Sequence, residues 1–207
     1  MLLDYNLLVR KYSMKVRGVL HIGAHHGEEH GIYRSHGISE IAYFEPIMSN
    51  YEVLSARVTD GSLLYNMALG AEEKEIEMYV ETQNKGQSSS VLEPGLHLVQ
   101  YPDIVFHMRE KVQMRRLDDV VDNSSGKYNM INMDVQGYEL EVLKGAVETL
   151  RNVDYIISEI NREEVYKGCA RIEQLQEFLQ PFGFVLMDQS WAGVTWGDGF
   201  FIKKHLI

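Results

Sequence analysis

Residues 19–29 are Val-Leu-His-Ile-Gly-Ala-His-His-Gly-Glu-Glu, and this stretch decides the fold class. A short apolar run ends in a glycine-containing turn, and acidic residues follow where a helix is expected to begin. Gly23 and Gly27 have no side chain, so a ligand can approach the backbone closely there. The first N–H groups of the following helix are free to bind a carboxylate or a phosphate. The stretch therefore predicts a strand–turn–helix unit that binds a ligand.

The next apolar strand ends in a single carboxylate. The sequence Ala42-Tyr43-Phe44-Glu45-Pro46 places Glu45 22 positions after Gly23. An acid at this position can accept both hydroxyl protons of a ribose, as it does in NAD enzymes, but the NAD fingerprint needs a glycine where this chain has His25. Taken alone, the glycines would be ordinary turn residues and Glu45 a solvated strand end. Together, at this spacing, they favour a nucleoside site that is not a dinucleotide site.

The rest of the chain continues the alternation of strands and helices. We expect strands at residues 16–22, 41–44, 63–65, 75–80, 112–117, 128–133, 155–160, 184–187 and 200–202. We expect helices at 2–13, 27–36, 46–58, 137–150 and 171–180, and a chain reversal at 196–199. This order predicts an α/β fold whose mostly parallel sheet has helices on both faces and binds its ligand at the carboxyl ends of the strands. Residues 1–207 are expected to form a single domain, with an N-terminal helix within 1–15 and an insertion candidate at 82–116.

Composition narrows the class of protein. Apolar residues make up 45% and charged residues 24% of the 207 residues, values ordinary for a globular domain. The net charge of −10 argues against a nucleic-acid partner. One cysteine, Cys169, excludes an internal disulfide, and no segment has the length of a membrane span or of a signal peptide's apolar region. We expect a cytoplasmic protein with neither nucleic-acid nor membrane partners; the oligomeric state stays open.

The order of its motifs resembles the FkbM-type family of S-adenosylmethionine-dependent methyltransferases. The resemblance covers residues 17–204 and rests on the ordered set of motifs, none of which is specific alone. The matching segments are residues 21–27, Phe44-Glu45-Pro46, 66–70, Ser88-Ser89-Ser90, 117–120, 132–139, Ser158-Glu159-Ile160 and 198–202. The resemblance implies a Rossmann-like methyltransferase fold, with a seven-stranded, mostly parallel sheet whose last strand is antiparallel. It also implies methyl transfer to an oxygen of a sugar or related small molecule.

The resemblance also implies a role for each cofactor-site residue. Gly23, Ala24 and Gly27 would line the methionine end of S-adenosylmethionine, Glu45 would hold the ribose and Pro46 would shape that turn. Asn66 and Ala68 would flank the adenine, and Asp134 would lie near the sulfonium and the acceptor.

Two departures from the family pattern concern the first motif. His21 stands where many members have Asp, and His25 where many have Asn. An acid that could meet the cofactor's ammonium group is therefore missing at position 21, and Glu28 or Glu29 could replace it. Asn132 also stands where members often have Lys.

The sequence contains two candidate metal sites, and for the second a metal-free function is the alternative. The segment His26-Gly27-Glu28-Glu29-His30 matches the zinc-protease pattern H-x-x-E-H, but it lies at a turn and lacks a third ligand. Asp134 and Glu159 each end an expected strand, with Asn161 two positions further on. Such oxygen ligands suit Mg²⁺ or Ca²⁺. The alternative, that these side chains bind the cofactor or acceptor directly, is slightly favoured.

The expected activity is O-methylation of a hydroxyl on a sugar, a glycan or a glycosylated metabolite. The candidate general bases are Asp134, Glu159 and a histidine such as His107. One alternative is a non-sugar small-molecule acceptor, and another is a nucleoside-binding module without turnover. Trp191 and Trp196 could stack on a sugar or pack in the core.

Overall fold

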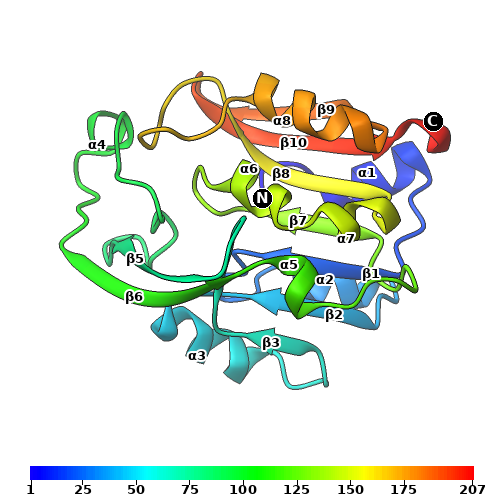
Figure 1. The fold of residues 1–207 in the computed structure, drawn as a ribbon, viewed down its shortest axis with the longest axis horizontal. Helices are drawn as coiled ribbons and strands as arrows, with labels where there is room; N and C mark the ends of the chain where they lie inside the picture. The colour runs from blue at the N-terminus through cyan, green and yellow to red at the C-terminus, as the bar shows by residue number, and fades with distance from the viewer.

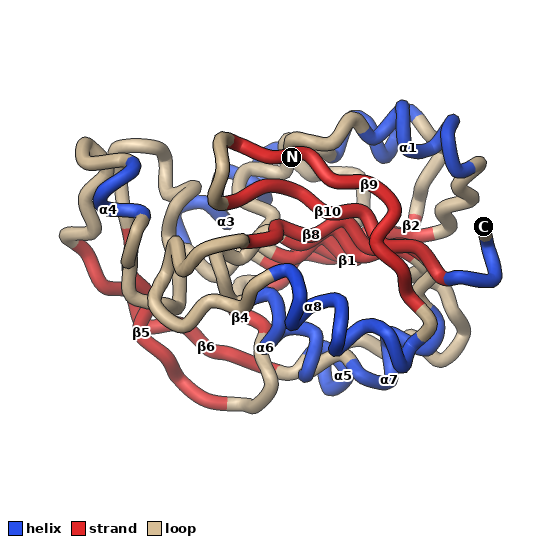
Figure 2. The backbone as a smooth tube through the Cα atoms, turned by 90° about the horizontal axis from the view of Figure 1, so that it is seen from above, coloured by secondary structure: helices blue, strands red, loops and turns tan.

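The computed structural model describes residues 1–207 and shows a seven-stranded sheet with helices on both faces (Figures 1 and 2). The strand order is β3-β2-β1-β7-β8-β10-β9. Every pair from β3 to β8 is parallel, whereas β10 is antiparallel to both β8 and β9. The Rossmann-like architecture with an antiparallel last strand is therefore confirmed.

The strands of this sheet are β1 (Gly18–Ile22), β2 (Glu40–Phe44), β3 (Leu63–Tyr65), β7 (Met130–Met133), β8 (Tyr155–Asn161), β9 (Phe184–Ala192) and β10 (Trp196–Lys203). Three further strands, β4 (Ala68–Leu69), β5 (Lys74–Val80) and β6 (Met108–Arg115), form a second sheet in the order β4-β6-β5. The β5–β6 pair extends away from the main sheet and carries residues 81–107 on its far side (Figure 1).

The two faces of the main sheet are covered by different helices. The helices of one face are α1 (Tyr5–Tyr12), α2 (His30–Ser35) and α3 (Met48–Arg57). Those of the other are α5 (Leu117–Val120), α6 (Glu139–Lys144), α7 (Val147–Asn152) and α8 (Ile172–Leu179), while α4 (His97–Gln100) lies in the 81–107 connection (Figure 2). The strand side chains alternate between the two cores; in β1, Val19 packs on the first face, and Leu20 and Ile22 pack on the second. Short 3₁₀ turns occur at Gln180–Phe182 and Lys204–Leu206. None of the helices has the length and apolar character needed to cross a membrane.

Two sequence-based expectations were wrong. The helix expected at 137–150 is split into α6 and α7 at residues 145–146, where the backbone packs so closely on Gly70 that a Cβ at Gly145 would lie 2.0 Å from the Gly70 carbonyl oxygen. Asp118 accepts the backbone N–H groups of Glu148 and Thr149, which fixes the start of the second helix. The reversal expected at 196–199 lies instead at 193–195, since residues 196–199 already pair with β8 and β9.

Candidate functional site

A cavity of about 700 Å³ opens at the carboxyl ends of the parallel strands. This volume lies within the range of roughly 300–1,000 Å³ that is usual for small-molecule and cofactor sites. The ends of β1, β2 and β7 form its floor, and the connection 81–107 forms much of its wall. The cavity lies where ligands bind in sheets of this type.

The turn after β1 is shaped by close packing against the end of β7. Gly23 has φ +74°, and a Cβ there would lie 1.8 Å from the Asp134 carbonyl oxygen. Only glycine fits this position, so the turn passes directly over the neighbouring strand. His25 also has a positive φ, of 48°, and its ring lies between Glu28, at 2.9 Å, and the Lys85 carbonyl oxygen, at 2.8 Å. The turn is thereby tied to the loop above it.

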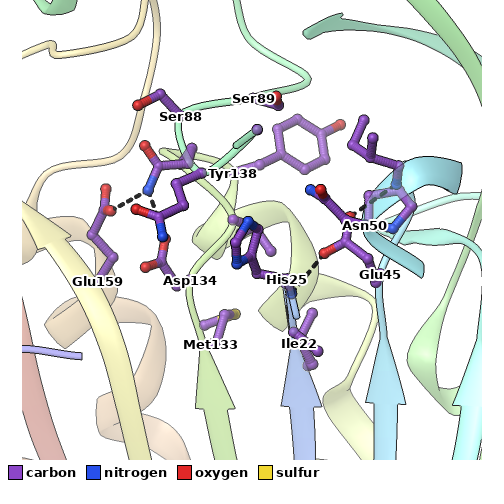
Figure 3. A pocket seen from close by; sticks show the side chains of 18 of the residues that line it. Ile22, His25, Glu45, Asn50, Ser88, Ser89, Met133, Asp134, Tyr138 and Glu159 are labelled. Carbon is purple, nitrogen blue, oxygen red and sulfur yellow. Dashed lines mark hydrogen bonds between the residues drawn. The ribbon is translucent and has the colours of Figure 1, made fainter. Parts of the chain in front are cut away.

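Glu45 occupies the end of β2 with its carboxylate turned towards that turn (Figure 3). It is 4% exposed, and its two oxygens accept the backbone N–H groups of His25, at 2.8 Å, and Ile47, at 2.9 Å. Each carboxylate oxygen has a second lone pair, so two further donors can bind. Burial raises the pKa of Glu45 to about 8, although these N–H groups and Asn50 act in the opposite direction. Asn66 donates to the backbone carbonyl oxygens of Glu45 and Pro46 and so fixes the turn.

A second group of carboxylates lies on the opposite side of the cavity, at the ends of β7 and β8 (Figure 3). The amide of Gln136 donates to Asp134 at 2.7 Å and to Glu159 at 2.8 Å. Gln136 has φ +54°, a conformation that is costly for a residue with a side chain and that is often found at functional sites. Burial, together with the nearby Asp134 and Glu139, raises the pKa of Glu159 well above its ordinary value.

Glu139 supports this group from beneath. It is fully buried, and one of its oxygens accepts the N–H groups of Val135 and Gly137, each at 3.1 Å. Burial raises its pKa to about 7. The carboxylate thus holds the backbone turn that aims Asp134 and Gln136 into the cavity.

The wall contributed by residues 81–107 is held in place by buried polar contacts. The Glu81 carboxylate accepts the N–H groups of Asn84 and Ser88, and the Tyr166 hydroxyl lies 2.7 Å from the Ser88 carbonyl oxygen. On the outer side, the Trp196 indole N–H donates to the Tyr101 hydroxyl at 2.9 Å. Residues 81–107 and the start of β10 therefore enclose one cavity.

The charge of the lining is one-sided. Seven carboxyl side chains line this cavity, and no lysine or arginine side chain does: Glu28, Glu29, Glu45, Asp103, Asp134, Glu159 and Asp198. The α-amino group of Met1 is the positive group of the lining and lies 3.7 Å from Glu29. The cavity therefore suits a cationic or neutral ligand and disfavours a pyrophosphate or a phosphorylated one.

Most of the sequence-predicted site residues meet at this cavity. The lining includes His21, Gly23, Ala24, Glu28, Glu45, Pro46, Ala68, Asp134 and Glu159. Gly27 and Asn66 lie just behind it: a Cβ at Gly27 would lie 2.7 Å from Leu54, and Asn66 braces the Glu45 turn. His107 is exposed and does not line the cavity.

Of the three residues proposed to bind a divalent ion, Asp134 and Glu159 line the cavity and Asn161 does not. Asn161 is fully buried behind the cavity lining and donates to Glu159 at 3.2 Å, whereas Asp134 and Glu159 share the Gln136 amide. The H-x-x-E-H histidines do not converge. His30 contacts Tyr43 and Asp60, while His26 stacks on His25 at 3.7 Å between ring centroids. His25, His26 and Glu28 are close enough to share an ion, but both ring nitrogens of His25 already have partners.

Two residues of the cavity were missed from the sequence: Gln136 and His97. Gln136 lies inside the segment 132–139, and its position directly after Asp134-Val135 was the available signal. His97 reaches the cavity only because residues 95–97 pair with Glu164 and Val165, a contact between distant loops. No local pattern in the sequence predicts this contact.

Comparison with known proteins identifies a family for this chain. The sequence model of the methyltransferase FkbM domain matches residues 21–186. The chain is 33% identical over 99 residues to the 2-O-methyltransferase NoeI of Sinorhizobium fredii. These residues span 47% of this chain and 41% of that relative, so the match covers less than half of either protein.

Two solved structures share the fold at low sequence identity. One is Sp1610 of Streptococcus pneumoniae, proposed to be a tRNA (m1A22) methyltransferase and solved with S-adenosyl-L-methionine. It gives a TM-score of 0.54 at 14% identity, over 96% of this chain and 71% of its own. An uncharacterised protein of Listeria monocytogenes gives a TM-score of 0.52 at 11% identity, over 98% and 68%.

Proposed function

The chain belongs to the FkbM methyltransferase family. We propose that it transfers a methyl group to a hydroxyl of a sugar, free or within a glycan or glycosylated metabolite. Family membership makes it an S-adenosylmethionine-dependent methyltransferase. The observation that carries the proposal is the lining of the cavity, which has seven carboxylates and no lysine or arginine. S-adenosylmethionine carries a sulfonium and an ammonium group, and such a lining stabilises both.

The cofactor is proposed to lie between Glu45 and Asp134. The spare lone pairs of Glu45 would accept the two ribose hydroxyl protons, and the tight turn at Gly23 would admit the methionyl group. Glu29 lies 3.9 Å from His21 and lines the cavity, but it is paired with the Met1 α-ammonium group at 3.7 Å; Glu28, which also lines the cavity, is the other carboxylate that could meet the cofactor's ammonium group. The reacting sulfur would then face Asp134 and Glu159.

The acceptor is proposed to occupy the space between these carboxylates and the 81–107 wall. Uncharged hydrogen-bonding groups line that wall, including those of Asn84, Gln87, Ser88, Ser89 and Tyr101. Hydroxyl and amide groups of this kind recognise a neutral polyol, and Trp196 offers an aromatic edge. The partial match to a 2-O-methyltransferase supports an oxygen acceptor.

The chemistry asks little of the protein beyond alignment and removal of a proton. The sulfonium supplies an electrophilic methyl group. Holding the acceptor oxygen in line with that group can contribute several kcal/mol towards lowering the barrier, up to about 7–11 kcal/mol in favourable cases. The Gln136 amide fixes the orientations of Asp134 and Glu159, so that both side chains are held at the place proposed for the reacting groups.

A labelled-methyl transfer assay tests the proposal. Wild-type protein is incubated with radiolabelled S-adenosylmethionine and separate panels of neutral oligosaccharides, glycosides, nucleotide sugars, RNA and phenols. We expect label on neutral carbohydrates and little on nucleotide sugars or RNA, because phosphates are repelled by the lining. Asp134→Asn is expected to abolish transfer, while Glu40→Gln, at the exposed start of β2, is the matched control. Transfer confined to phenols or RNA would refute the sugar assignment, and no transfer to any acceptor would favour a module that binds without turnover.

A further inference from the structure

His97 is a buried histidine of the cavity whose ring forms no hydrogen bond. It begins α4, is 3% exposed, and packs against the rings of Tyr101, Phe106 and Tyr166 at 5.0–5.4 Å between centroids. Its Nδ1 is buried without a partner. Its Nε2 also forms no hydrogen bond, but this atom is not fully buried. Because His97 lines the cavity, Nε2 is the ring nitrogen that a ligand there can reach. A buried histidine without partners is unusual, because burying an unpaired polar group is costly.

The other histidines of the cavity lining already have partners, and the carboxylates at the ends of β7 and β8 are partly engaged. The two oxygens of Glu159 accept the amides of Gln136 and Asn161, and one oxygen of Asp134 accepts the same Gln136 amide. The ring nitrogens of His25 have two partners, and the ring of His21 lies deep in the floor, 3.4–3.5 Å from Asn132 and Tyr33. His97 is thus the histidine of the lining that keeps a nitrogen free for a ligand.

The surroundings of His97 favour its neutral form. Burial lowers its pKa below the ordinary value, and the Glu81 carboxylate opposes this shift only in part. The other titratable groups packed against the ring are the hydroxyls of Tyr101 and Tyr166. Burial also raises the pKa of Tyr166 well above its ordinary value, so that group stays neutral. At neutral pH the imidazole is therefore available as a proton acceptor.

We propose that His97 is a catalytic residue whose Nε2 accepts the proton of the acceptor hydroxyl during methyl transfer. The proposal rests on the proposed function of the cavity. The acceptor oxygen forms a bond to the methyl carbon while the bond between that carbon and sulfur breaks, and its proton passes to Nε2. The sulfonium becomes a neutral sulfide and the imidazole becomes an imidazolium. The positive charge thus passes from the sulfonium to the imidazolium of His97. Both positions lie within the same acidic cavity, whose seven carboxyl side chains favour a positive charge.

Histidine NMR tests this proposal without a known acceptor. The ring signal of His97 is assigned by its loss in His97→Asn and is titrated with saturating S-adenosylmethionine or S-adenosylhomocysteine. A sulfonium near the ring repels the imidazolium, so we expect the pKa of His97 to be lower by about 0.5–1 unit with S-adenosylmethionine. Identical titrations in the two complexes overturn the proposal. Failure of both cofactors to bind would instead overturn the proposed function.

Kinetics with a carbohydrate that the transfer assay identifies give a second readout. His97→Asn and His97→Gln are expected to lower kcat by about 10²–10⁴-fold. Affinity for S-adenosylhomocysteine should stay within twofold, and added imidazole should restore part of the activity. The acid limb of the wild-type pH profile should disappear in both variants. His205→Asn, an exposed histidine near the C-terminus, is the matched control. A variant with unchanged kcat and an unchanged acid limb refutes the role of His97.

Discussion

Replacing Glu45 by Gln probes the ribose contact on which the cofactor assignment depends. In the wild type, each carboxylate oxygen accepts one backbone N–H, from His25 or Ile47, and keeps one lone pair for a ribose hydroxyl. The glutamine keeps one such oxygen. Its NH₂ group cannot accept a hydroxyl proton, and it faces a backbone N–H that also donates.

The magnitude follows from this count of donors and acceptors. A hydrogen bond to a charged group contributes about 1.5–3 kcal/mol. Loss of one of the two ribose bonds therefore predicts about 2 kcal/mol, or roughly 30-fold weaker binding of S-adenosylhomocysteine. The backbone N–H left without an acceptor is expected to lower the free energy of unfolding by about 1–3 kcal/mol.

Isothermal titration calorimetry at pH 8.5 measures the loss, because the carboxyl group of Glu45 is ionised above its pKa of about 8. Glu40→Gln is the control: Glu40 begins the same strand, is exposed and pairs with Lys127 at 2.9 Å. Thermal unfolding establishes that the Glu45 variant is folded at the assay temperature. A folded Glu45→Gln protein that binds S-adenosylhomocysteine within twofold of the wild type would refute the ribose assignment.

Three further predictions address pH, stability and metal. The ribose hydroxyls favour ionised Glu45, whose pKa in the free protein is about 8. Affinity for S-adenosylhomocysteine should therefore rise about tenfold from pH 6.5 to 8.5 in calorimetry and stay flat in Glu45→Gln; a flat wild-type profile contradicts this. Asp118→Ala should lower the free energy of unfolding in urea by about 1–2 kcal/mol, because α7 loses its cap, without changing cofactor affinity; unchanged stability would show that the cap is unimportant. Asn161 is buried behind the cavity lining, so a divalent ion could be held only by Asp134 and Glu159. Such an ion predicts that EDTA abolishes methyl transfer and that Mg²⁺ restores it; activity that survives EDTA would leave these side chains as groups of the acceptor site.

The sequence predicted most of the sheet because its signals there are local. The apolar run of β1, the glycine turn and the acid at the end of β2 all lie within residues 18–45, and each has a direct backbone consequence. The carboxylates at the ends of β7 and β8 were also predictable, because parallel strands bring their carboxyl ends to one edge.

The missed features depend on contacts between distant segments. Gly145 is a tolerable helix residue by sequence, but in the structure it caps α6 and packs closely on the Gly70 carbonyl group. The strand β10 begins at Trp196 because two neighbours pair with it there, which outweighs the turn propensity of its glycines. The choice between His97 and His107 depends on how the 81–107 connection packs on Val165 and Tyr166. The sequence around these two histidines does not predict that packing.

A crystal structure of the S-adenosylhomocysteine complex shows where the cofactor binds. We predict that both ribose hydroxyls lie within about 2.5–3.0 Å of the two Glu45 oxygens. The amino-acid end should rest on the Gly23 turn, and the sulfur should face Asp134 with open space towards His97. Density for the cofactor outside this cavity, or within it with the ribose away from Glu45, would contradict the account.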